Sequence, residues 1–137
     1  MLLDSNIIIY SINPTSPKQK RAQEFIQDNI ENIVVAHQNI NEALRVLTHP
    51  KFPFPMLPTK ALKAVTNITD RIEIISPTLT SILTTLDLIK KYKVKGDKIF
   101  DTYLVATMLT NGITEIATDN VKDFSVFNEV KVVNPFK

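Results

Sequence analysis

The chain has 137 residues, which is the size of one ordinary domain with a single core. Hydrophobic residues make up 44% and charged residues 22%, which excludes a disordered chain, and a net charge of +2 is too small to indicate nucleic-acid binding by itself. There is no cysteine, so disulfides, thiolate zinc sites and a cysteine nucleophile are all excluded. Any metal must be held by oxygen atoms or by histidine.

The N-terminal sequence MLLDSNIIIY carries an Asp at position 4, where a secretory signal would need a basic patch and a long apolar run. Charged residues also interrupt every apolar stretch that would be long enough to span a bilayer. We therefore expect a cytoplasmic protein without a membrane segment.

The first half of the chain alternates short apolar runs with amphipathic stretches, which predicts strands alternating with helices. The first apolar run ends at Asp4, so this carboxylate is expected at the carboxyl end of a strand. Glu42 falls on a helix that ends before His49 and Pro50. In chain order we expect a strand at 1–3, helices at 7–12 and 18–29, a strand at 33–36 and a helix at 38–48.

The second half begins with residues 51–58, which contain three prolines and are therefore expected to form a linker. The pair Ser76-Pro77 with Thr78 is expected to start a helix, and Asp101 lies in the first turn of a later one. We expect a helix at 59–69, a strand at 72–75, a helix starting at 76–78, a helix at 98–110, a strand at 115–117, a polar loop or helical turn at 118–124 and a strand at 131–133.

This alternation predicts an α/β fold in which a parallel sheet of about five strands is covered on both faces by helices. In such sheets the ligand site lies at the carboxyl ends of the strands, near the point where the strand order reverses.

Acidic residues occupy several element junctions on that side of the predicted sheet, namely Asp4, Glu42, Asp101, Asp119 and Asp123. Converging carboxylates repel one another, and a buried carboxylate is costly without a compensating cation. Oxygen ligands suit a hard divalent ion, so the pattern points to Mg²⁺ or Mn²⁺.

Each acid also has a simpler interpretation. Asp4 could act only as the N-cap of the helix that follows it. Glu42 could form a surface ion pair with Arg45, three residues later. Asp101 could be favoured by the helix dipole, with Asp97 as the true cap. The recurrence of acids at corresponding junctions favours a common site.

Four segments, in this order and at these separations, resemble the PIN-domain ribonucleases and among them the VapC-type toxins of toxin-antitoxin pairs. They are LLDSNIIIY at 2–10, NEALRVLTHP at 41–50, GDKIFDTYLVATMLTNG at 96–112 and TDNVKDF at 118–124. The resemblance covers nearly the whole chain and implies one PIN-like domain over 1–137. It further implies a three-layer α/β/α fold and an acidic pocket that binds one or two Mg²⁺ or Mn²⁺ ions and cleaves RNA.

The resemblance also assigns roles to individual residues. Asp4, Glu42 and Asp101 match the first three acids of the family, which serve in catalysis and metal binding. Ser5 stands where the family usually has Thr or Ser, and Asn6 matches the Asn beside it.

The fourth acid departs from the pattern, because many relatives carry Asp two places after the Thr, and this chain has Asn120 there. Asp123 occupies a position that serves as the acid in some relatives, although it could also be an ordinary loop residue. We predict Asp123 as the fourth catalytic and metal-binding acid. Thr118, Asn120 and Asp119 are predicted as supporting polar groups.

RNA binding needs cations near the acids, and we predict that Arg45 and Lys51 contact the RNA backbone. His37 and His49 are predicted to lie outside the site.

A toxin of this family is expected to inhibit translation, to be held inactive by a cognate antitoxin that covers the acidic pocket, and to form homodimers. Two alternatives stay open. One is a catalytically weak PIN relative that binds metal or RNA. The other is a receiver-type signalling domain, which would need an acceptor Asp where this chain has Ser76 and Pro77.

Overall fold

The computed structural model describes residues 1–137 and contains one five-stranded sheet in the order β3-β2-β1-β4-β5. Every neighbouring pair of strands is parallel, as predicted. The strands are short and lie close to the predicted runs: β1 Leu2–Leu3, β2 Val34–Ala36, β3 Glu73–Ile75, β4 Glu115–Ala117 and β5 Lys131–Val133.

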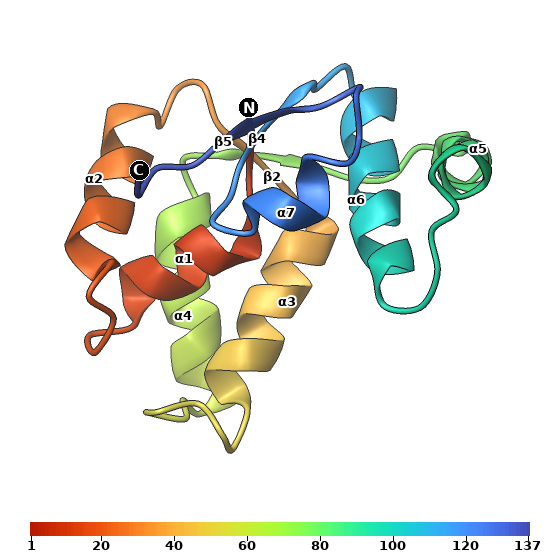
Figure 1. Cartoon of the computed structure of the whole chain (residues 1–137). Helices are drawn as coiled ribbons and strands as arrows, with labels where there is room; N and C mark the ends of the chain where they lie inside the picture. Colours follow the sequence, from red (N-terminus) through yellow and green to blue (C-terminus); the bar gives the residue numbers. More distant parts are fainter.

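Seven helices connect the strands, and they lie on both sides of the sheet (Figure 1). Their bounds are α1 Ser5–Ile12, α2 Gln19–Asp28, α3 His37–Thr48, α4 Pro58–Thr69, α5 Ser81–Tyr92, α6 Lys98–Thr110 and α7 Val121–Phe124. The predicted three-layer α/β/α fold is therefore confirmed.

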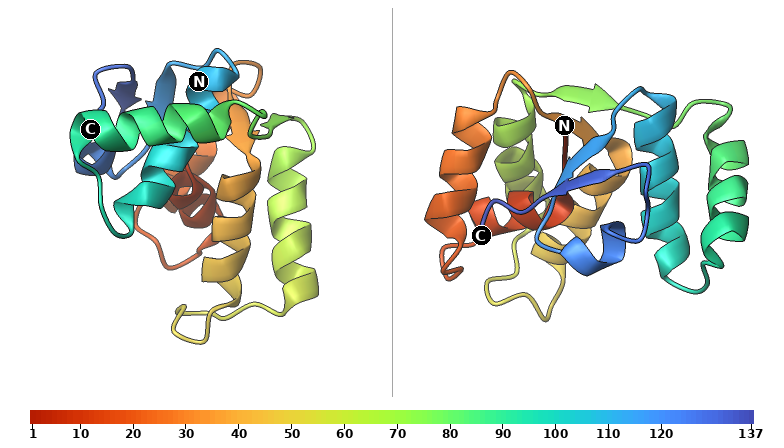
Figure 2. Two further views of the ribbon diagram at one scale, coloured as in Figure 1. Left: turned by 90° about the vertical axis from the view of Figure 1, so that its right-hand side faces the viewer. Right: turned by 45° about the horizontal axis from the view of Figure 1, so that its top comes forward.

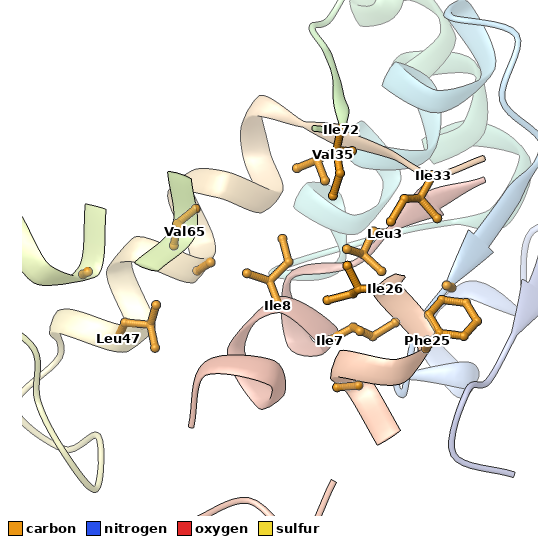
Figure 3. Packing of buried hydrophobic residues seen from close by; sticks show 14 residues of the cluster. Leu3, Ile7, Ile8, Phe25, Ile26, Ile33, Val35, Leu47, Val65 and Ile72 are labelled. Carbon is orange, nitrogen blue, oxygen red and sulfur yellow. The ribbon is translucent and has the colours of Figure 1, made fainter. Parts of the chain in front are cut away.

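Side chains that alternate along the strands divide the interior into two hydrophobic cores, because successive strand residues point to opposite faces. Leu3 and Val35 point into the core beneath α1–α4, where Ile7, Phe25 and Leu47 join them (Figure 3). Leu2, Val34 and Ile116 point to the other face, against α5, α6 and α7. The central strands are thus buried on both faces, which explains their uninterrupted apolar sequence.

The strand order reverses at β1, since the chain adds β2 and β3 on one side of β1 and later β4 and β5 on the other. Leu3 is paired with Ala117 in this register, and the backbone N–H of Asp4 donates to the carbonyl of Ala117 at 3.0 Å. Asp4 and Thr118 consequently leave neighbouring strands at the same edge. This is the position at which parallel α/β sheets bind ligands.

Two helix starts differ from the prediction by more than one residue. Helix α1 begins at Ser5 rather than at residue 7, because the Asp4 side chain accepts a hydrogen bond from the Ser5 N–H and caps the helix. Helix α5 begins at Ser81 rather than at 76–78, where Ser81 Oγ accepts from the N–H of Thr78. The segment 118–124, predicted as a polar loop or helical turn, contains the short helix α7.

Helix α5 lies outside α6, at the periphery of the molecule (Figure 2). Its buried face consists of Ser81, Thr85 and Leu88, whereas Ile82 and Leu83 are exposed. None of the helices has the length and apolar character required to cross a membrane.

Candidate active site

Asp4 is the most buried of the candidate acids, with 4% of its surface exposed at the carboxyl end of β1. Its Oδ1 accepts from the Ser5 N–H at 2.7 Å, and its Oδ2 accepts from Asn6 Nδ2 at 2.8 Å and Thr118 Oγ1 at 2.6 Å. All of these partners are donors, as an ionised carboxylate requires. Asp4 therefore caps α1, and its two carboxylate oxygens accept all of these hydrogen bonds.

Burial raises the pKa of the Asp4 carboxyl, while hydrogen bonds from Thr118 and Ser5 lower it and the negative charge of Glu42 raises it further. The donors thus offset part of the cost of burying this charge.

Thr118 and Asn6 bind Asp4 and also each other, because Asn6 Nδ2 donates to Thr118 Oγ1 at 3.0 Å. Thr118 Oγ1 additionally accepts from the N–H of Asn120 at 2.9 Å, and Asn6 Oδ1 accepts from the N–H of Asp119 at 3.3 Å. The loop after β4 is therefore fastened to the start of α1 by two side chains with all their polar atoms in use.

Glu42 is reached by Ser5, whose hydroxyl lies 3.0 Å from Glu42 Oε2 and 3.4 Å from Asp4 Oδ1. A hydroxyl has one proton to donate, and the shorter distance assigns it to Glu42. No ion pair joins Glu42 to Arg45, so that simpler interpretation is wrong. Ser5 instead brings the first two acids together.

Asp101 lies in the first turn of α6 and shares one cavity with Asp123 of α7. Burial, followed by the negative charges of Asp123, Asp4 and Glu42, raises the pKa of Asp101 to about 6. The structure thus brings the four predicted acids into one electrostatic environment. Asp97 occupies the N-cap position of α6, but its side chain makes no capping hydrogen bond.

The nearest cation to this pair is Lys98, whose Nζ lies 3.7 Å from Asp123 Oδ1. Both side chains are substantially exposed, so the attraction is weak. Lys98 lowers the pKa of Asp101, but only as the smallest of the contributions.

Asp119 is turned away from the other acids. Its Oδ2 accepts from Lys18 Nζ at 2.5 Å and from the Tyr10 hydroxyl at 2.9 Å, and Lys18 lies over the rings of Tyr10 and Phe136. Although burial raises the pKa of Asp119, the bonds from Lys18 and Tyr10 lower it below its usual value. Its charge is already neutralised by a cation of the chain.

The remaining predicted residues line different cavities, and only some of these cavities contain an acid. Arg45 shares with Glu42 a cavity between α3 and α6 of about 440 Å³. Lys51 lies in the next hollow, with Arg45 and His49 but without any acid. Asn120 is exposed and lines a hollow with Asp123. His37, predicted to lie outside the site, lines the cavity that contains Glu42.

The sequence matches the model of the PIN domain family over residues 1–130. The chain belongs to the PIN domain family. A search of curated proteins finds no match to this PIN domain.

Solved structures with the same fold come from toxin-antitoxin systems. VapBC2 from Rickettsia felis, bound to a promoter DNA fragment, matches with a TM-score of 0.74 and 16% identity over 97% of this chain and 96% of that one. VapBC-1 from nontypeable Haemophilus influenzae gives a TM-score of 0.72 and 19% identity over 99% and 98%. VapC20 from Mycobacterium tuberculosis, described as a sarcin-ricin loop cleaving toxin, gives 0.71 and 11% over 94% and 97%.

One residue of this PIN domain site was missing from the sequence prediction. Asn39 is fully buried, its Nδ2 lies 3.4 Å from Asp4 Oδ1, and its Oδ1 accepts from the N–H of Ala36 at 3.2 Å. It precedes Glu42 by three residues and therefore lies on the same side of α3. This spacing was the available signal.

No group of three Asp, Glu or His side chains of this PIN domain converges closely enough to enclose a metal ion. The chain itself therefore offers an incomplete set of oxygen ligands. Such a set is typical of Mg²⁺, which usually keeps several waters and is held by one or two carboxylates together with substrate phosphates.

Proposed function

We propose that this PIN domain is a metal-dependent endoribonuclease that hydrolyses RNA phosphodiester bonds, with Asp4, Glu42, Asp101 and Asp123 as its catalytic and metal-binding acids. The observation that carries the proposal is the proximity of the acids, because the Ser5 hydroxyl lies between Asp4 and Glu42 and Asp101 shares a cavity with Asp123. Burial and the charges of Asp123, Asp4 and Glu42 also raise the pKa of Asp101 to about 6. Carboxylates gathered in this way are destabilised until a cation joins them.

The donor atoms suit Mg²⁺ or Mn²⁺, as one or two ions. Asp4 Oδ1 has a single short hydrogen bond, from the Ser5 N–H, and its other two contacts are 3.4 Å long, so it keeps a lone pair for a cation. A bound ion lowers the pKa of a water molecule and neutralises charge on the phosphate oxygens. Waters and substrate phosphates would supply the ligands that these carboxylates do not.

The supporting residues orient these acids. Thr118 and Asn6 fix Asp4 Oδ2, and Ser5 directs Glu42 toward Asp4. Asn120 supports Thr118 through its backbone N–H, and Asp119 anchors the same loop to α1 through Tyr10. Orientation of this kind keeps the ligands in place without reorganisation during the reaction.

Arg45 and Lys51 are proposed to bind RNA phosphates beside the acids. Arg45 lies on the wall of the cavity that contains Glu42, and Lys51 extends the positive surface along the adjoining hollow. The contribution of each is expected to depend on salt concentration.

We further propose that the protein is the toxin of a type II toxin-antitoxin pair that inhibits translation in the cytoplasm, where its RNA target would be found. The structural likeness to VapBC proteins supports this role. The largest cavity, about 580 Å³ between α1, α2 and α4, contains none of the four acids and is lined partly by Ile26 and Ile68. An antitoxin that packs an apolar segment there and extends over the acids would block the site.

A homodimer is proposed through α5, where Ile82, Leu83 and Leu86 are exposed side by side on one helix. Adjacent aliphatic side chains of this size rarely face water on a monomer. The change Leu83→Lys should shift the sedimentation profile of the protein toward the monomer.

Cleavage of a fluorescent RNA panel tests the proposed activity. The purified protein is assayed with Mn²⁺, with Mg²⁺ and with EDTA, together with the variants Glu42→Gln and Asp101→Asn. Cleavage that needs the ion and is lost in both variants supports the proposal and excludes a contaminating ribonuclease. Calorimetric metal binding without cleavage would instead favour the alternative of a PIN relative that binds but does not cut.

A further inference from the structure

A cavity between α3 and α6 adjoins the acids and contains planar side chains that the proposed reaction does not use. Its walls carry Phe100 and Tyr103 from α6, and His37 and Arg45 from α3. Glu42 lines the same cavity, so the space is continuous with the candidate active site. Gln38 Nε2 of α3 donates to the carbonyl of Phe100 of α6 at 3.0 Å and so links the two helices at this cavity.

We propose that this cavity binds a base of single-stranded RNA, stacked on Phe100 or Tyr103, next to the phosphate that is cleaved. The inference rests on the proposed ribonuclease function and names the form of RNA that the site takes. Single strands are favoured because only unpaired bases can turn outward and stack on aromatic side chains.

The exposure of Phe100 is the first argument. It leaves 64% of its surface in water, although it lies one residue before Asp101 in the first turn of α6. A large aromatic side chain so close to the acids can contact a substrate without any movement of the backbone. The cavity measures about 440 Å³, within the range of about 300–1,000 Å³ typical of small-ligand sites.

The polar lining is the second argument. Gln38 and Asn41 present side-chain amides, which can hydrogen-bond to the edges of bases, and Arg45 supplies a cation for the adjoining phosphate. Glu42 is the only acid of the lining. Arg45 is therefore the group of this cavity that can attract a phosphate, and the other side chains apart from Glu42 present no negative charge to the strand.

A second cavity, beside Asp101 and Asp123, is lined by lysines and indicates where a bound RNA strand would continue. The cavity beside Asp101 and Asp123 measures about 330 Å³ and is lined by Lys93, Lys95 and Lys98. Lys93 adopts a left-handed backbone conformation with φ of 53°, in which a glycine would be less strained. Lysines there suit backbone phosphates, so a strand would run from the aromatic cavity across the acids to the lysines.

The test measures binding of a fluorescein-labelled, mixed-sequence single-stranded oligoribonucleotide in EDTA, which prevents metal-dependent cleavage. Phe100→Ala should weaken binding about fivefold or more, the range expected for one lost stacking contact. Phe100→Trp should retain the affinity, because the planar face remains. Phe54→Ala is the matched control, since Phe54 is an aromatic residue with 57% exposure in the loop between α3 and α4.

Salt dependence separates stacking from charge. The slope of log K against log salt should be the same for Phe100→Ala as for the wild type, because no charge is lost. Lys93→Gly, which suits the backbone conformation at this position, should reduce the slope. Affinity for a duplex of the same sequence should not respond to Phe100→Ala.

Two results would overturn the inference. One is an unchanged single-strand affinity in Phe100→Ala, and the other is an equal loss in Phe54→Ala. If Phe100→Ala alters the sedimentation profile but not RNA affinity, the cavity belongs to a contact between protein chains and the inference fails. In each case metal-dependent RNA cleavage by the wild type would leave the proposed function intact, so the two failures are distinguishable.

Discussion

Two regions of the candidate site surround their carboxylates in opposite ways. Asp4 is buried and accepts short hydrogen bonds from Ser5, Asn6 and Thr118. Asp101 and Asp123 face a cavity, with the distant and exposed Lys98 as their nearest cation. Hydrogen bonds from the chain offset part of the cost of burying the Asp4 charge, although burial still raises its pKa, whereas no such hydrogen bonds lower the pKa of Asp101.

Substitutions of carboxylates or their partners in the two regions are therefore expected to change the stability of the fold in opposite directions. Around Asp4, each lost donor leaves a buried polar atom without a partner, so substitutions should destabilise the fold. At Asp101, removing the charge removes the cost of its burial and the repulsion from neighbouring carboxylates, so a substitution should stabilise the fold while it harms activity. Each of the following predictions tests one side of this contrast.

The largest effect is expected for Asp4→Asn. Cleavage should fall about 100-fold or more, because a metal ligand worth several kcal/mol of charge stabilisation is lost. Stability should also fall by about 1–3 kcal/mol, since the new amide NH₂ meets donors that now point at Asp4. RNA hydrolysis and urea unfolding measure the two effects. Asp87→Asn, an exposed change on α5, should alter neither, and a fully active Asp4→Asn would remove Asp4 from the site.

A divalent ion should stabilise the protein through the open region. With Mn²⁺ at about 100 times its dissociation constant, the free energy of unfolding should rise by about 2.7 kcal/mol. The increase should be smaller in Asp123→Asn, which removes one carboxylate of the pair. Thermal melting over a Mn²⁺ titration measures this shift. Equal shifts in the wild type and the variant would show that Asp123 is not a ligand.

Thr118→Val tests the hydrogen-bonded region without changing any charge. Thr118 is fully buried, and valine keeps its volume but removes the hydroxyl that binds Asp4, Asn6 and the N–H of Asn120. Unfolding in urea should show a loss of about 1–2 kcal/mol. Thr118→Ser retains the hydroxyl and should lose less. Wild-type stability in Thr118→Val would show that the hydrogen bonds of this hydroxyl contribute nothing, and any loss in Thr118→Ser would then come from its missing methyl.

The sequence predicts those features of this site that follow from the order of strands and helices along the chain. Asp4 follows a short apolar strand, Glu42 lies on the helix that follows β2, and Asp101 lies in the first turn of α6, so alternation of strands and helices brings them to one edge of a parallel sheet. Strand β4 and helix α6 also match their predicted bounds, because their apolar spacing is regular and Gly112 ends the segment between them.

Contacts between distant segments are what the sequence does not reveal. Asp119 directly follows Thr118, where it could serve as a further metal ligand. In the fold its carboxylate instead forms an ion pair with Lys18, which lies far away in the sequence. Asn39 reads as an ordinary polar helix residue until the fold places it against Asp4. Helix α5 has apolar residues at helical spacing, yet Leu83 is exposed, since periodicity identifies an apolar face without identifying what covers it.

The smallest expected effect is the change in stability at Asp101. Its sign tests the proposed difference between the Asp4 and Asp101 regions. The pKa of Asp101 is raised to about 6 in the folded protein, so between about pH 4 and 6 the folded state binds more protons than the unfolded state. Stability therefore falls as pH rises through this window and stays lower above it. Asp101→Asn carries no charge and avoids that loss.

Asp101→Asn should accordingly be more stable than the wild type near neutral pH, by about 1 kcal/mol once solvent screening of this partly exposed group is considered. The advantage should shrink as the pH falls through about 6 and disappear near pH 4. Urea unfolding at several pH values, without divalent ions, measures the difference, with Asp87→Asn as the variant that should show none. A constant difference at every pH would mean that neither burial nor the neighbouring carboxylates raise the pKa of Asp101, and the open region would then need no cation to balance it.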